Sequence, residues 1–399
     1  MKSETHSVED LIYKPLSGEW GDDIGEINVL RTTNFNNDGT LNLSEVVKRS
    51  IDSSKVEKKK LKFGDTIIEK SGGSPSQPVG RVVYFNIKDE TFLCNNFTSV
   101  IRPKENLHSR YLFWYLYHNH LNQNTRKYQN KTTGIINLQL ERYIKELQIP
   151  LPSLPIQKRI AEILDAADAL KRKDQELLKK YDELAQAIFI DMFGDPVKNE
   201  KGWEVKRLGQ HCDVGSSVRV FVEELVGEGV AFYRGTEIGA LSVGDVVKPT
   251  LFITDEHYHK LKIQGGVPQI GDLLMPSICP DGRIFEVKDE NPFYFKDGRV
   301  LWIKVDKTKY NSVYLKYLLK ETFFRSYLKI ASGTTFAELK IFALKDLELC
   351  IPPIKLQTQY AALVNKIITQ KSYSVQTSTN SIELFNSLIQ KAFKGELVS

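Results

Sequence analysis

Cysteine is scarce in this chain of 399 residues, and long hydrophobic runs are absent. The four cysteines, Cys94, Cys212, Cys279 and Cys350, lie far apart and form no C-x-x-C pair, which argues against a disulfide or metal framework. No stretch approaches the roughly 20 apolar residues that a membrane-spanning helix needs. Because residues 1–10 are polar, we also expect no signal peptide. The few, unpaired cysteines make a reducing cytoplasm the expected location.

The sequence also lacks a convincing catalytic motif. The string Asn291–Tyr294 has no second proline and no glycine-rich cofactor loop before it, as a base methyltransferase would need. A P-loop requires G-x-x-x-x-G-K-[ST], which the segment Gly73–Arg81 does not match. Pro280-Asp281 and Glu286–Lys288 contain nuclease-like letters, but too few residues separate them. The seven histidines form no H-E-x-x-H pattern. We therefore predict no catalytic residue, no metal site and no cofactor bound by this chain.

Length and charge leave room for a nucleic-acid partner. A chain of this length is expected to split into two or more domains. Its formal net charge of +5 permits a polyanion as partner but does not require one.

The most informative positive feature is an internal repeat. From Lys145 to Ala161 the second copy follows at a constant offset of 200, as in Pro152 and Pro352 or Gln157 and Gln357. The repeat also includes Gly-Asp pairs, Gly-Arg pairs and Ser/Thr/Gly clusters, at Gly64-Asp65 and Gly271-Asp272, Gly80-Arg81 and Gly282-Arg283, and 132–134 and 332–335. A unit repeated once suits a target that also consists of two halves.

Each copy is predicted to be a mixed α/β globule followed by a long helix. Runs rich in β-branched and aromatic residues predict the strands 26–30, 66–69, 81–87 and 97–101, and then 230–234, 272–275, 283–287 and 299–305. Shorter helices are expected at 109–120 and 313–328. The segment 250–266 has no evident counterpart in the first copy. The predicted domains are 1–153, a helix in 154–196, 197–352, and a helix and tail in 353–399.

The two long helices are predicted to pair as an antiparallel coiled coil. In the first, apolar residues follow heptad spacing, with Asp174 at one core position. In the second, the centre 372–381 is polar, so the helix either frays there or is supported by its partner. The residues predicted to form the seam or to dock partner subunits are Ile160, Ile163, Leu170, Leu177, Tyr181, Leu184, Ile188, Leu363, Ile367, Leu384 and Leu388.

Small, hydroxylated and basic residues gather at the predicted turns of both globules. Glycine and hydroxyl loops allow close approach to phosphates, and arginine and lysine contact phosphates or base edges. The candidate DNA contacts are Arg31, Thr33, Lys70, Ser71, Arg81, Lys131, Thr132 and Thr133 in the first half, and Arg234, Thr236, Arg283, Ser332, Thr334 and Thr335 in the second. The arginines could instead support their own loops.

The segment Leu151–Leu164 resembles the specificity subunits of type I restriction–modification enzymes, whose domains end in a proline-containing strand followed by a Gln-Lys-Arg-Ile helix. The second copy, Ile351–Gln357, is similar but looser. The segment Trp203–Gly209 also matches the start of a domain in that family, as the closing segment Lys391–Leu397 matches its end. No such opening is visible in the first 25 or so residues, so the start of the first domain stays open.

The resemblance implies two target-recognition domains for a split DNA sequence, with antiparallel helices that set the gap and dock two modification subunits. S-adenosylmethionine would then be bound by those subunits, and ATP and Mg²⁺ by restriction subunits. Two alternatives remain at this point: a fused methyltransferase or nuclease, and a helical interaction scaffold that no longer binds DNA.

Overall fold

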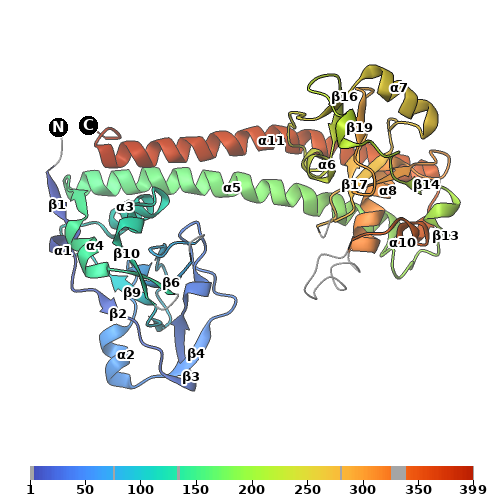
Figure 1. The fold of residues 1–399 in the computed structure, drawn as a ribbon. Helices are drawn as coiled ribbons and strands as arrows, with labels where there is room; N and C mark the ends of the chain where they lie inside the picture. The colour runs from blue at the N-terminus through green and yellow to red at the C-terminus, as the bar shows by residue number, and fades with distance from the viewer. Residues whose placement is uncertain (1–3, 75–76, 133–134, 279–280, 325–337, 399) are drawn as a thin grey trace. The chain divides into compact units, whose positions relative to one another are not determined.

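The computed structural model describes residues 4–74, 77–132, 135–278, 281–324 and 338–398. Its chain divides into two compact units. The first lobe comprises residues 1–175 and 376–399, and the second lobe comprises residues 176–375. The helices α5 (Leu154–Phe193) and α11 (Ile354–Lys394) each contribute one part to each lobe (Figure 1).

The remaining elements of the first lobe are β1 (Thr5–Ser7), α1 (Val8–Leu11), β2 (Leu16–Ser17), β3 (Asp22–Leu30), η1 (Thr32–Asn34), β4 (Val47–Ser50), α2 (Ser53–Lys59), β5 (Thr66–Glu69), β6 (Ser71–Gly73), β7 (Val82–Tyr84), β8 (Phe92–Cys94), β9 (Thr98–Ile101), α3 (Ser109–Leu121), η2 (Asn124–Tyr128), β10 (Gln129–Thr132), β11 (Ile135–Leu138), α4 (Leu140–Glu146) and β12 (Gln148–Pro150). Those of the second lobe are β13 (Glu204–Arg207), η3 (Leu208–Gln210), β14 (Asp213–Gly215), η4 (Val222–Glu224), β15 (Val230–Tyr233), α6 (Gly235–Ser242), β16 (Phe252–Ile253), α7 (Asp255–Gln264), β17 (Leu273–Pro276), β18 (Phe285–Glu286), β19 (Phe293–Phe295), β20 (Val300–Lys304), α8 (Ser312–Leu319), η5 (Lys320–Phe324), α10 (Ile341–Lys345) and β21 (Glu348–Ile351).

The two lobes share the topology of three sheets. Four antiparallel strands run in the order β2-β9-β5-β7 in the first lobe and β14-β20-β17-β18 in the second. A three-stranded sheet, β4-β3-β8 or β16-β15-β19, contains one parallel pair in each lobe. The pairs β1-β12 and β13-β21 complete the match, so the sequence repeat corresponds to a repeated fold.

The pairing of the outer strands also locates the start of the first domain. The amide of Val8 donates to the Leu147 carbonyl, as the amide of Leu208 donates to the Leu347 carbonyl. Residues 5–8 therefore take the place of 205–208, although the tryptophan motif is absent.

The expectation that segment 250–266 lacks a counterpart is wrong. The segment contains β16 and α7, which follow β15 and precede β17. In the first lobe β4 and α2 occupy the same place in the order and pair with β3 in the same way. Local sequence did not reveal this because the short strand and helix share topology rather than composition.

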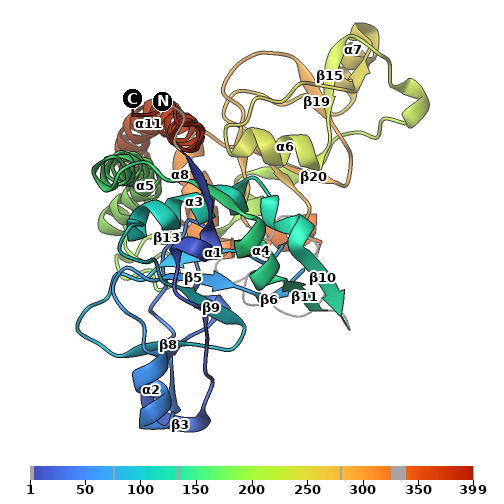
Figure 2. The same cartoon turned by 90° about the vertical axis from the view of Figure 1, so that its left-hand side faces the viewer.

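The core of the first lobe lies where its globule meets the long helices. Ile160 and Leu164 of α5 pack in one buried cluster with Phe385 and Ile389 of α11. The indole of Trp114 in α3 lies 5.4 Å, between ring centroids, from Phe385. Figure 2 shows α3 beside α5, with α2 and β3 at the end of the lobe remote from the helices. The long helices are thus part of the domain core and do not merely connect domains.

The second lobe shows that α5 and α11 run antiparallel. The Lys371 Nζ lies 2.6 Å from the Asp182 Oδ1, whereas farther along α5 the ring of Phe189 lies 5.5 Å from that of Tyr360. Later residues of α5 thus meet earlier residues of α11. Tyr314 of α8 stacks on Phe189, so this core also joins globule and helices.

The predicted seam is only partly correct. Ile160 is buried, and Ile188, Ile367 and Leu388 pack against the cores, while Ile163 and Tyr181 are half-buried. Five predicted seam residues are exposed, with exposed fractions of 45% for Leu170, 41% for Leu177, 47% for Leu184, 42% for Leu363 and 46% for Leu384.

The residues that the long helices bury differ from the predicted seam, because each helix packs against the globule as well as against the other helix. Ala161 and Ala167 allow close packing, and Asp168 and Lys171 are buried together, with 2.6 Å between Oδ1 and Nζ. The Lys171 ammonium also lies 4.0 Å from the ring centroid of Phe385. A paired, buried charge thus takes a place that the heptad pattern assigned to leucine.

The polar centre of α11 remains helical. The helix is continuous from Ile354 to Lys394, so residues 372–381 do not fray. Ser378 and Ser381 are buried, and the Ser381 hydroxyl donates to the Ser378 carbonyl at 2.9 Å. This bond satisfies the buried Ser381 hydroxyl within the helix itself. Of the two alternatives that the sequence left open, fraying is excluded because the helix is continuous.

One buried glutamine joins helix and globule in each lobe. The Gln157 Oε1 accepts from the His108 amide at 2.8 Å, and its Nε2 donates to the carbonyls of Asn106 and Pro152. Gln357 repeats this arrangement with the Asn311 amide and the carbonyls of Lys309 and Pro352. We call each set the glutamine bridge.

We expect Gln357→Ala to lower the free energy of unfolding by about 3 kcal/mol, because it leaves one buried amide and two carbonyls without partners. Urea denaturation followed by circular dichroism measures the change. The control is Gln359→Ala, an exposed position two residues away on the same helix. Equal stability of the two variants would contradict a structural role for the bridge.

Candidate nucleic-acid interface

Arg31 and Arg234 occupy the same structural position in the two lobes. Each directly follows the last residue of a strand, β3 or β15, that pairs in parallel with another strand. In these pairs Leu30 faces Cys94 and Tyr233 faces Phe295. Each also caps a helical turn, η1 or α6. The sequence predicted both arginines as contacts, and the strand register shows that they are equivalent.

The side chain three residues later fixes each of these turns. The Arg31 amide donates to the Asn34 Oδ1 at 2.8 Å, and the Arg234 amide donates to the Glu237 Oε2 at 3.1 Å. The Arg234 Nη2 also donates to the Glu237 Oε1 at 2.5 Å, while 52% of the Arg234 side chain stays exposed. Arg234 is therefore oriented and still accessible.

The electrostatics of Glu237 follow from these bonds. Burial alone raises the pKa of Glu237, but hydrogen bonds from Arg234 and Thr236 outweigh it and lower that pKa to about 2. The carboxylate is therefore ionised at neutral pH and keeps the arginine in one orientation.

A cleft of about 660 Å³ in the second lobe brings several predicted residues together. Arg234, Thr236 and Arg283 all line it, although they come from separate segments of the chain. The other lining residues are Gly235, Pro276, Ser277, Ile278, Lys296 and Arg299. The four basic side chains, together with the apolar Pro276 and Ile278, suit contacts to the phosphates and bases of a nucleic acid.

Lys296 and Arg299 are the residues that the sequence prediction missed. They flank Gly298, whose φ of +66° marks a tight turn between β19 and β20. The rule that selected the other candidates, a basic residue at a turn, applies to both of them. The Lys296 Nζ lies 3.3 Å from the Asp297 Oδ1, and the Arg299 Nη1 lies 3.8 Å from the Glu338 Oε1.

Arg81 has a different environment from the one predicted. Its Nε and Nη2 donate to both oxygens of Glu69, at 2.9 and 3.0 Å, and only 12% of the side chain is exposed. The same guanidinium donates to the carbonyls of Thr32 and Phe35. A group this enclosed supports its own loop, which was the alternative that the sequence left open.

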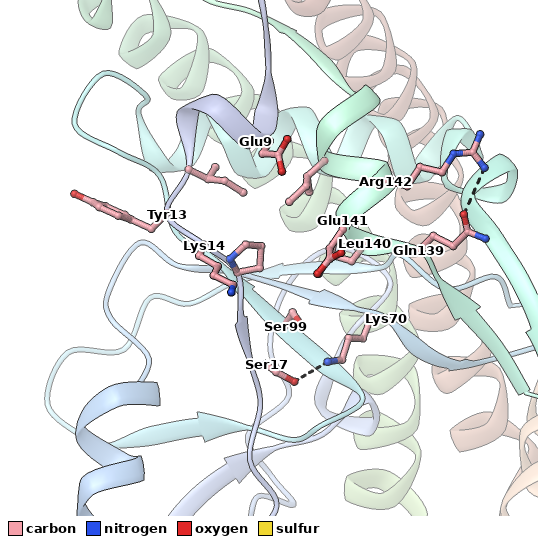
Figure 3. A pocket seen from close by; sticks show the side chains of 13 residues that line it. Glu9, Tyr13, Lys14, Ser17, Lys70, Ser99, Gln139, Leu140, Glu141 and Arg142 are labelled. Atoms are coloured by element: carbon pink, nitrogen blue, oxygen red, sulfur yellow. Dashed lines mark hydrogen bonds between the residues drawn. The ribbon is translucent and has the colours of Figure 1, made fainter.

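Lys70 lines another cleft, of about 750 Å³, in the first lobe. Figure 3 shows its ammonium directed at Ser17, whose Oγ lies 2.7 Å away. Partial burial lowers the pKa of Lys70. The walls carry acidic as well as basic side chains, among them Glu9 and Glu141, so this cleft is less suited to a phosphate backbone than the one in the second lobe.

The other candidates of the first lobe lie in or beside the three-stranded sheet β10-β11-β6 and in the turn η1. The Ser71 Oγ donates to the Asn137 Oδ1 at 2.6 Å, and Thr33 is exposed in η1. Lys131 and Thr132 belong to β10, which joins the sheet β10-β11-β6 with Ser71. Four candidates lie outside the described residues: Thr133, Ser332, Thr334 and Thr335.

The described residues contain no group of three or more His, Cys, Asp or Glu side chains arranged to hold a metal ion. None of their helices combines the length and the apolar character needed to cross a bilayer.

Comparison with known proteins agrees with this architecture. A family model described as the type I restriction modification DNA specificity domain matches residues 21–180. A putative type I restriction enzyme specificity subunit of Haemophilus influenzae is 26% identical over 306 residues, covering 73% of this chain and 70% of the relative. The StySPI specificity subunit of Salmonella potsdam is 24% identical over 376 residues, covering 86% and 77%.

Solved structures show the same fold. The S subunit of a type I system from M. genitalium superimposes with a TM-score of 0.56 at 14% identity, covering 98% of this chain and 96% of that one. A chain from a type I restriction–modification system studied for its complex assembly gives a TM-score of 0.52 at 17% identity, covering 99% and 98%.

Fold and site together define a duplicated α/β protein with paired long helices and basic turn surfaces. In sequence the chain is similar to the specificity subunits of type I restriction–modification enzymes, and it shares the fold of a solved S subunit.

The Arg234–Glu237 pair predicts a pH dependence of stability. The pKa of Glu237 is lowered on folding from 4.5 to about 2, so its contribution is complete above about pH 5 and is lost as the pH falls toward 2. We expect Glu237→Gln to be less stable than the wild type at pH 7, with the difference shrinking between pH 5 and pH 3.

Urea denaturation at each pH measures this difference. Glu290→Gln, at an exposed position of the same lobe, is the control and should follow the wild-type curve. A constant difference between Glu237→Gln and wild type across this range would contradict the assignment.

Proposed function

We propose that this chain recognises a bipartite, asymmetric DNA target, with each lobe contacting one half-site. The observation that carries the proposal is the identical strand register that places Arg31 and Arg234 at equivalent capped turns. In the second lobe this turn opens on a cleft with four basic side chains. Phosphate contacts would orient each lobe, and base contacts would select the sequence.

The two half-sites are expected to differ. Asn34 occupies in the first lobe the place of Glu237 in the second, and η1 is three residues long where α6 has eight. Different side chains at equivalent turns would contact different base edges. An asymmetric target follows from this divergence.

The chemistry would come from partner subunits. S-adenosylmethionine would be bound by two modification subunits, and ATP and Mg²⁺ by restriction subunits. The long helices would dock the modification subunits and set the gap between half-sites.

The decisive experiment is methylome sequencing of cells that contain the modification subunits, with and without this chain. We expect methylated adenines in one split motif only when the chain is present. Purified chain incubated with DNA and labelled S-adenosylmethionine should transfer no methyl group. Transfer by the chain alone would favour a fused enzyme, and no motif in either culture, with no shift of duplex DNA, would favour a scaffold.

The exposed leucines of α5 are candidates for docking the modification subunits. Leu170, Leu177 and Leu184 recur every seven residues, so they lie on one face of the helix. Large apolar side chains exposed in a row are typical of a surface that a partner covers.

We expect Leu177→Glu to weaken association with the modification subunits by at least tenfold while the melting temperature stays unchanged, because a charge would be buried in the interface. Size-exclusion chromatography and calorimetry with the purified subunits measure this. Lys179→Glu, on the same helix with 78% of its side chain exposed, is the control. Wild-type assembly of Leu177→Glu would refute this docking face.

A further inference from the structure

Arg81 and Arg283 are equivalent residues of the duplicated fold. In the first lobe β5 pairs with β7 so that Ile68 faces Val82, and the Glu69 amide donates to the Arg81 carbonyl at 2.9 Å. In the second lobe Leu274 of β17 faces Phe285 of β18. In the first lobe, one further residue along the antiparallel register places Arg81 opposite Glu69. In the second lobe, two further residues along the register place Arg283 opposite Pro276.

The neighbouring β9 and β20 strands confirm this alignment independently. Glu69 faces Thr98 and Pro276 faces Val300, each at the last residue of its strand. The backbone after them also matches, because the Lys70 amide donates to the Phe97 carbonyl as the Ser277 amide donates to the Arg299 carbonyl. Glu69 and Pro276 are therefore the same position in the two lobes.

The exchange of glutamate for proline changes what faces the arginine. In the first lobe Glu69, with 4% of its side chain exposed, binds the Arg81 guanidinium through two parallel hydrogen bonds. In the second lobe Pro276 offers no carboxylate. There Arg283 pairs with Asp281, two residues away, keeps 38% of its side chain exposed and lines the basic cleft.

Arg81 connects the sheet to the turn that carries Arg31 and Thr33. Its Nη2 donates to the Thr32 carbonyl at 3.2 Å and its Nη1 to the Phe35 carbonyl at 3.2 Å. Two carbonyls of one short turn are thus held by a guanidinium that Glu69 orients. Lysine could not make these bonds together, because it lacks the planar fork of donors.

We propose that the duplicated arginine has taken two roles. Arg81 is a positioning residue that holds the turn 31–37 against its half-site without touching DNA, and Arg283 contacts DNA directly. This inference rests on the proposed DNA-binding function. Recognition of the half-site then depends on the buried Arg81–Glu69 ion pair in the first lobe and on the exposed Arg283 side chain in the second.

The test uses the complex with its modification subunits and the split motif obtained from methylome sequencing. Affinity is measured for the cognate duplex and for duplexes with base changes in one half-site or the other. We expect Arg81→Lys to lower discrimination about tenfold at one half-site and to leave the other unchanged. Arg283→Lys should lower discrimination at the opposite half-site only.

The ratio of the affinities for cognate and altered duplexes distinguishes a residue that positions the DNA-contacting turn from one that only stabilises its lobe. If Arg81 only stabilised its lobe, Arg81→Lys would lower the melting temperature and weaken cognate and altered duplexes equally. That outcome, or wild-type ratios at both half-sites, overturns the inference. An effect of both variants on the same half-site overturns it as well.

A reciprocal variant restores the missing carboxylate. We expect Pro276→Glu to bind the Arg283 guanidinium as Glu69 binds Arg81, and so to lower discrimination about tenfold at the half-site affected by Arg283→Lys. Wild-type discrimination by Pro276→Glu contradicts the inference. A wild-type complex that discriminates at neither half-site refutes the proposed function itself, which distinguishes the two failures.

Discussion

The glutamine bridge is the interaction on which each lobe depends. Gln157 and Gln357 are fully enclosed, yet their amides meet one N–H donor and two carbonyl acceptors each. These bonds join the first turn of a long helix to the loop before α3 or α8 and to the proline-containing strand end. A buried amide is tolerated because all of these groups are satisfied, and it fixes one geometry because any shift would leave them unpaired. The globule is thereby fixed to its helix at a defined point.

Duplication preserved the backbone while its supporting contacts diverged. The buried Asp65 accepts two hydrogen bonds from Arg102, both at 2.7 Å. Its counterpart Asp272 accepts from the Trp302 indole at 2.8 Å, and burial raises the pKa of Asp272. Arg81 and Arg283 show the same pattern, because the carboxylate partner is Glu69 in the first lobe and Asp281 in the second. A strand register survives such exchanges because backbone hydrogen bonds carry it, whereas a side-chain partner can change with a single codon.

Each long helix has a buried face, which contacts the globule and the other helix, and an exposed face. The spacing of apolar residues alone does not show which face is which. The buried face mixes alanine, aromatic and paired charged residues, since it contacts the globule as well as the other helix. The regularly spaced leucines of α5 face outward instead. A heptad of leucines therefore does not by itself say which face of a helix packs against the second helix of the same chain.

The sequence by itself determined the duplication, the two long helices and the eight strands β3, β5, β7, β9, β15, β17, β18 and β20, because these follow from periodicity and turn residues that are local along the chain. It also selected Arg234, Thr236 and Arg283, which the fold gathers in one cleft. Only the tertiary structure decided that Arg81 is enclosed by Glu69, that segment 250–266 has a counterpart, and that Leu170, Leu177 and Leu184 are exposed. Those outcomes depend on contacts between residues far apart in sequence, and local propensity carries no information about which distant side chain will occupy the neighbouring space.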